Sequence, residues 1–149
     1  MSARTDIIRR GAVRAAALAF GIFIIAAIFI ANSGQGATWW PFLDKIPFGD
    51  KLGHVGLFGT LGFLCNLAFP RFRLRFLPRF ITATTFVLLI LISLEELAQT
   101  FIPTRTCDLA DWLADLVGLF AGQLAAIALT GIGRRKITNA SPSPDRAAP

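Results

Sequence analysis

The sequence contains no tyrosine, a single histidine and few charges, which make up 16% of its 149 residues. It has no P-loop, no HExxH motif and no serine placed beside the histidine as a nucleophile, which argues against the chemistries that those motifs carry. Hydrophobic residues reach 54%, too many for a soluble domain of this length, and they fall in long blocks. A lipid bilayer is therefore the expected solvent.

Four apolar stretches are long enough to cross a hydrocarbon core about 30 Å thick. In lipid such stretches form helices, because open strands leave backbone groups unpaired. The sequence predicts an all-α, polytopic membrane protein with four transmembrane helices in one compact bundle, spanning residues 1–136. The Pro-, Ser- and Ala-rich residues 137–149 are predicted to be a disordered cytoplasmic tail. The helices are expected at about 12–31, 52–69, 80–101 and 108–130.

Arginines before the first stretch are also compatible with a cleaved export signal, although its length favours an uncleaved anchor.

Twelve of the 15 Lys and Arg residues lie at the N-terminus, in the loop at 71–79 and at the C-terminus. The positive-inside rule then predicts a multi-pass protein of the bacterial cytoplasmic (inner) membrane, with both termini cytoplasmic. Basic rims bind anionic lipid headgroups, so the partner is the bilayer and no nucleic acid is expected.

Acidic residues gather on the opposite side, where five of the nine lie between positions 94 and 115. Asp108, Asp111 and Asp115 share one helical face at spacings of three and seven, and Gly118 and Gly122 continue it. Small residues mark a face that packs on another helix. The acids should therefore point into the bundle, where exposure to lipid is avoided.

A second polar segment, Asp50-Lys51-x-x-His54, opens the helix at 52–69 on the same outer side. We therefore predict an outward-facing polar pocket, with Glu95 turned to headgroups or solvent. His54 and Glu96 are its candidate catalytic residues. Its candidate ligand-binding residues are Asp50, Lys51, Gln99, Arg105, Asp108, Asp111 and Asp115.

The pattern over about residues 50–122 resembles the VanZ-like membrane proteins. The resemblance is carried by Asp50-Lys51-x-x-His54 and by Glu96-x-x-Gln99-x-x-x-Pro103-x-Arg105-x-x-Asp108-x-x-Asp111, which leads into Asp115 and Gly118-x-x-x-Gly122. This chain departs from the family at Asp115, where members usually have Asn, and at Val55, where they usually have an aromatic residue. The resemblance implies a small multi-span protein of the cell envelope, linked in some members to resistance against glycopeptide antibiotics of the teicoplanin type.

Two functions remain open at this point, so the sequence leaves enzymatic activity undecided. One is binding of an envelope lipid or glycan without turnover. The other is an enzyme acting on a lipid-linked or phosphate-bearing substrate, with His54 and Glu96 in acid–base roles and Lys51 and Arg105 holding the anion. Metal binding by His54 with nearby acids is a further alternative, but no metal or other cofactor is predicted.

Structural roles compete with each of these functional ones. Asp50 is suited to capping its helix, and Asp108 and Asp111 to the start of theirs. Arg105 is suited to a salt bridge with Glu96 or Asp111. An ion path through the membrane is disfavoured, because the acids stop in the outer half.

Overall fold

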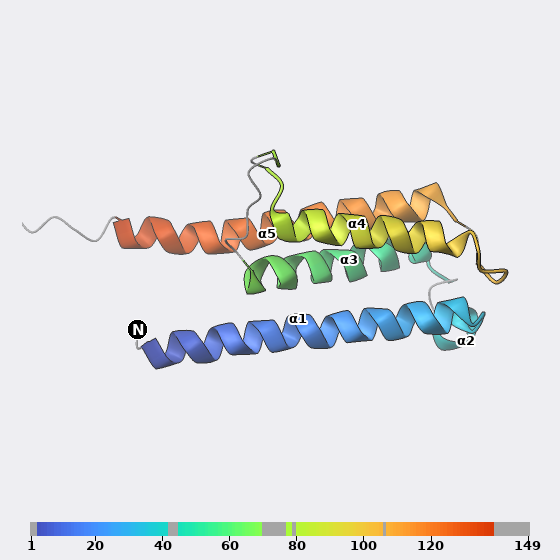
Figure 1. Cartoon of the computed structure of the whole chain (residues 1–149), viewed down its shortest axis with the longest axis horizontal. Coiled ribbons are helices and arrows are strands. Elements are labelled where there is room, and N and C mark those ends of the chain that lie inside the picture. Colours follow the sequence, from blue (N-terminus) through green and yellow to red (C-terminus); the bar gives the residue numbers. More distant parts are fainter. Residues whose placement is uncertain (1–2, 42–44, 70–76, 79, 106, 139–149) are drawn as a thin grey trace, which may run out of the picture.

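The computed structural model describes residues 3–41, 45–69, 77–78, 80–105 and 107–138. This part of the chain is all-α, as predicted, and contains no strand. Figure 1 shows the four long helices side by side and alternating in direction, with the N-terminal end of α1 and the C-terminal end of α5 at the same end of the molecule. The helices are α1 (Ala3–Asn32), α2 (Gly36–Trp39), α3 (Gly49–Ala68), α4 (Ala83–Gln99) and α5 (Leu109–Thr138).

The helix boundaries differ from the predicted ones in ways that local contacts explain. α4 is shorter than the predicted 80–101, because the Thr82 side chain accepts a hydrogen bond from the Thr85 amide and caps the helix. α3 begins at Gly49, so Asp50 and Lys51 lie within its first turn. The short helix α2 was not predicted. α5 continues to Thr138, and residues 139–149 of the predicted tail lie outside the described residues.

Helices α3 and α5 are the most closely packed pair of helices in the bundle. A methyl group on Gly62 would lie 2.8 Å from the carbonyl oxygen of Leu119, and one on Gly122 would collide with the carbonyl oxygen of Gly59. The two backbones therefore touch without intervening side chains, which confirms the predicted packing role of the glycine stripe on α5.

Neutral polar side chains join α3, α4 and α5 near the beginning of α4. This buried polar node consists of Asn66, Thr82, Thr85 and Gln123, each at most 7% exposed. Thr82 donates to the side-chain oxygen of Asn66 at 2.6 Å and Gln123 accepts from the Thr82 amide at 2.9 Å. Gln123 also donates to the Phe80 carbonyl at 2.7 Å. The start of α4 is thereby fixed to both neighbouring helices.

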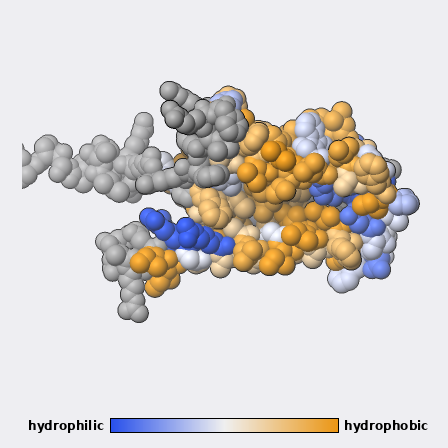
Figure 2. Space-filling view, in the orientation of Figure 1, coloured by the Kyte–Doolittle hydropathy of each residue, from blue (hydrophilic) through white to orange (hydrophobic). Residues whose placement is uncertain are grey.

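The outer surface of the bundle is apolar. Figure 2 shows hydrophobic residues over its middle and hydrophilic residues near its two ends. Phe29 and Phe101 are 79% and 83% exposed, a degree of exposure that soluble proteins avoid over such an area. Two described helices are long and apolar enough to cross a membrane by length and composition, Ile7–Asn32 and Leu109–Gly131. α3 and α4 are shorter, with 20 and 17 residues.

Candidate functional site

The first turns of α3 and α5 meet at one end of the bundle, beside the last turns of α4. All nine predicted site residues lie there and are linked to one another through hydrogen bonds or ion pairs. We call this group, together with Glu95, the polar cluster. Its members are Asp50, Lys51, His54, Glu95, Glu96, Gln99, Arg105, Asp108, Asp111 and Asp115.

Lys51 is the cation at the centre of the contact between α3 and α5. Its ammonium group lies 2.8 Å from Asp108 Oδ2 and 3.3 Å from Asp50 Oδ2, and it also contacts Asp111 Oδ1. Asp108 precedes α5, and its Oδ1 accepts from the Ala110 amide at 2.8 Å, as a helix cap does. The Lys51 hydrogen bond, aided by the Ala110 amide, holds the pKa of Asp108 below its usual range.

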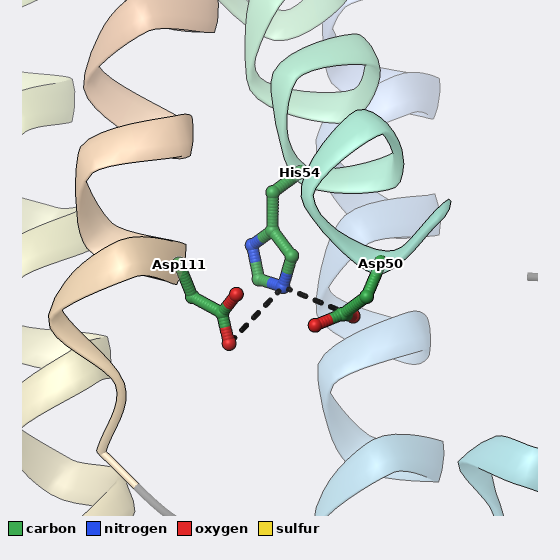
Figure 3. A group of neighbouring side chains, drawn as sticks. All are labelled: Asp50, His54 and Asp111. Atoms are coloured by element: carbon green, nitrogen blue, oxygen red, sulfur yellow. Dashed lines mark ion pairs between the residues drawn. The ribbon is translucent and has the colours of Figure 1, made fainter. Parts of the chain in front are cut away.

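His54 lies one turn further along α3, between three carboxylates. Its Nδ1 is 2.7 Å from Oδ1 of Asp115, whose side chain is 1% exposed. Its Nε2 faces Asp50 Oδ1 at 3.8 Å and Asp111 Oδ2 at 4.0 Å, as Figure 3 shows. The three atoms that Asp50, His54 and Asp111 present to one another lie within 4.8 Å, so these residues could hold a metal ion.

Glu96 connects α4 to the beginning of α5. Its Oε1 accepts from the Asp108 amide at 2.7 Å and its Oε2 accepts from the Gln99 side chain at 3.1 Å. The Arg105 Nε in turn donates to Gln99 Oε1 at 3.3 Å. Because both oxygens of Glu96 are engaged and the residue is 5% exposed, its contacts are those of a residue that positions its neighbours. Its catalytic role stays a prediction.

Several of the competing structural expectations can now be compared with the contacts. Asp50 does not cap α3, since the N-cap is Phe48, which adopts a left-handed conformation with φ of 56°. Arg105 forms no ion pair with Glu96 or Asp111 among the residues that the structure describes. Glu95 does not simply face outward, because it accepts a hydrogen bond from Gln99 at 3.0 Å and is half-buried.

Two polar features were missed by the sequence reasoning. The buried polar node was not foreseen, and its signals were the isolated amides of Asn66 and Gln123 within apolar runs. The second is the hydrogen bond that the Trp112 indole donates to the Ser93 hydroxyl at 3.1 Å. An apolar groove of about 400 Å³ lies at the other end of α3, lined by Cys65, Phe69, Thr84, Val87 and Leu88. Its wall includes no predicted site residue, and the predicted polar pocket stays a prediction.

Comparison with known proteins gives one positive result. No curated protein and no solved structure matches the chain. The family model described as VanZ/LLP1 matches residues 10–130, a range that contains the whole polar cluster and the buried polar node. Since this match covers well over half of the sequence, the chain belongs to the VanZ/LLP1 family.

Proposed function

We propose that this protein crosses the bacterial inner membrane four times, through α1, α3, α4 and α5, with both termini in the cytoplasm. The antiparallel order of the helices supports this topology, as does the apolar surface over the middle of the bundle. At about 1.5 Å per residue, α4 is about 26 Å long, close to the shortest helices that span a bilayer. The domain is residues 1–136, and the polar cluster faces the outside of the cell.

We further propose that the polar cluster binds a component of the cell envelope, a lipid or a glycan, and thereby changes susceptibility to glycopeptide antibiotics of the teicoplanin type. The observation that carries the proposal is the connection of ten charged or polar residues from α3, α4, α5 and the intervening loop into one network. Packing alone does not require these charges, because the buried polar node joins the same three helices with neutral amides and hydroxyls. Charges within a bundle are costly and usually serve a function.

The proposal is tested by susceptibility to glycopeptides and to other envelope agents in cells with and without the protein. We expect His54→Ala to abolish any change in susceptibility that the wild type causes. Thr130→Val is the matched control, because within the described part of the chain the Thr130 hydroxyl bonds to carbonyls of its own helix, at Ala126 and Ile127. An unchanged susceptibility profile, or full activity of His54→Ala at equal membrane levels, would contradict the proposal.

One contact favours a second candidate, an enzyme acting on a lipid-linked or phosphate-bearing envelope substrate. The short contact between Asp115 and His54 Nδ1 orients the imidazole and leaves Nε2 to transfer a proton. The two candidates separate in a binding measurement with envelope lipid extract. If His54→Ala abolishes the change in susceptibility while its affinity for the extract persists, catalysis is supported. If the affinity for the extract is lost as well, binding is supported.

A further inference from the structure

We propose that Asp50, His54 and Asp111 bind one divalent metal ion between the first turns of α3 and α5. This inference rests on the proposed function, since it names the cation through which the polar cluster would hold an anionic oxygen of its envelope ligand. The three residues come from two helices, and their side chains converge on a common point (Figure 3). The ion itself can be tested without that ligand.

The spacing of the three ligand atoms suits such an ion. His54 Nε2 is 3.8 Å from Asp50 Oδ1 and 4.0 Å from Asp111 Oδ2. Ligands bound at about 2.1 Å from a metal lie about 3.0–3.4 Å apart when adjacent and about 4.2 Å apart when opposite. The two separations from His54 fall between these values, and all three ligand atoms lie within 4.8 Å of one another, so side-chain rotations would close the site.

Lys51 leaves these particular atoms available. Its ammonium group contacts Oδ2 of Asp50 and Oδ1 of Asp111, whereas the opposite oxygen of each carboxylate faces His54. The resident cation and the ion therefore use different oxygens. Their coexistence is also favoured by charge, because the polar cluster holds six carboxyl groups but only two permanent cations, Lys51 and Arg105. Uncompensated carboxylates are costly in a bundle of low dielectric.

Asp115 supplies the support that metal-binding histidines generally have. With Asp115 accepting the proton of Nδ1 at 2.7 Å, the lone pair of Nε2 points toward Asp50 and Asp111. A carboxylate behind the histidine fixes the tautomer and the ring orientation, and removing it typically weakens metal binding about 10–100-fold. Asp115 is 1% exposed and belongs to the α5 face that packs on α3, so we assign it as a positioning residue.

The chemistry of the ligands indicates the class of ion. One imidazole and two carboxylates suit Mn²⁺, Zn²⁺ or Mg²⁺, ions that also accept water and phosphate oxygens at their remaining positions. The exposed Asp50, with a side chain 66% accessible, leaves one side of the site open to such a ligand. Mn²⁺ is the most informative probe, because it is paramagnetic.

The experiment is a titration of the purified full chain in nanodiscs with Mn²⁺, followed by electron paramagnetic resonance. We expect one saturable Mn²⁺ per chain, with nitrogen modulation from the bound imidazole in pulsed spectra of the wild type. His54→Gln and Asp111→Asn should weaken binding at least about 10-fold, and Asp115→Asn about 10–100-fold. Asp108→Asn is the matched control, because Asp108 also contacts Lys51 but lies outside the trio.

Lys51→Met gives a second control in which a cation is lost and every ligand is kept. Metal binding should be retained or tightened there. Absence of saturable binding in the wild type would overturn the proposal, as would equal affinity in His54→Gln and Asp111→Asn, or bound Mn²⁺ without nitrogen modulation. The titration contains no envelope ligand, so its failure would not contradict an effect of the protein on glycopeptide susceptibility. Conversely, Mn²⁺ binding without any change in susceptibility would contradict the proposed function and leave the metal site supported.

Discussion

At the scale of single residues, Glu96 fixes the end of α4 to the start of α5. In Glu96→Gln one carboxylate oxygen is replaced by an NH2 group, which donates hydrogen bonds and does not accept them. Either the Asp108 amide or the Gln99 side chain then loses the oxygen to which it donates. Loss of a buried acceptor costs about 1–3 kcal/mol, so we expect the free energy of unfolding in mixed micelles to fall by that amount. An unchanged free energy of unfolding would contradict this positioning role.

The Lys51–Asp108 contact predicts a pH dependence of stability. The Lys51 hydrogen bond lowers the pKa of Asp108 in the folded state, so the stabilisation is complete above the unfolded carboxyl pKa of about 3.9 and is lost as the pH falls through the lower folded value. Asn also caps helices well, so Asp108→Asn removes the charge and keeps the cap. The stability difference between wild type and Asp108→Asn should be constant from about pH 7 to about pH 5, shrink once the pH falls below about 4, and vanish only below the depressed folded pKa. A difference that persists in acid would refute the ionic origin.

At the scale of helices, the contact between α3 and α5 depends on Gly122. A methyl group there meets the Gly59 carbonyl oxygen, which is backbone and cannot rotate away. We expect Gly122→Ala to lower the free energy of unfolding by about 3 kcal/mol. In Gly131→Ala, on the same helix, the new methyl group meets nothing within 4 Å, so stability should stay the same or rise by up to about 1 kcal/mol. Equal effects of the two substitutions would show that the helices are not in close contact.

The sequence predicted those features of the helices that depend on local pattern. The apolar runs located the four long helices, and the spacing of Asp111, Asp115 and Gly118 identified the face of α5 that packs inward. Which polar residue of one helix contacts which residue of another could not be predicted, because it depends on how each helix is rotated in the bundle. The pairing of His54 with Asp115, and of Lys51 with Asp108 and Asp111, therefore emerged only with the fold.

Other features escaped prediction because they join residues far apart in sequence. The start of α4 depends on the Thr82 cap and on Gln123, which is 41 positions away. Apolar residues at 80–81 extended the predicted helix across that cap. Glu95 was predicted to face headgroups or solvent, yet it accepts from Gln99 as Glu96 does, and Glu96 alone of the two also accepts from the Asp108 amide.

At the scale of the whole molecule, the proposed topology places Cys107 outside the cell and the end of α5 inside. With Cys65→Ser as background, a membrane-impermeant maleimide should label Cys107 in intact cells, whereas Gly131→Cys in a Cys65→Ser, Cys107→Ser background should react only after lysis. Partial desolvation and the neighbouring Glu96 carboxylate raise the pKa of the Cys107 thiol, so the labelling rate should still be rising at about pH 8.5, the pKa of an ordinary thiol. Labelling of both positions from the same side would refute the four-span topology.

The contact between the backbones of α3 and α5 constrains how a ligand can be admitted. His54 and Asp115 lie on either side of that contact, so they keep their mutual geometry unless two main chains separate. In the proposed site, opening would then come from α4, which carries Glu96 and Gln99. The side formed by the histidine and the carboxylates of α3 and α5 would stay fixed, and different ligands would be accommodated by changes on the α4 side.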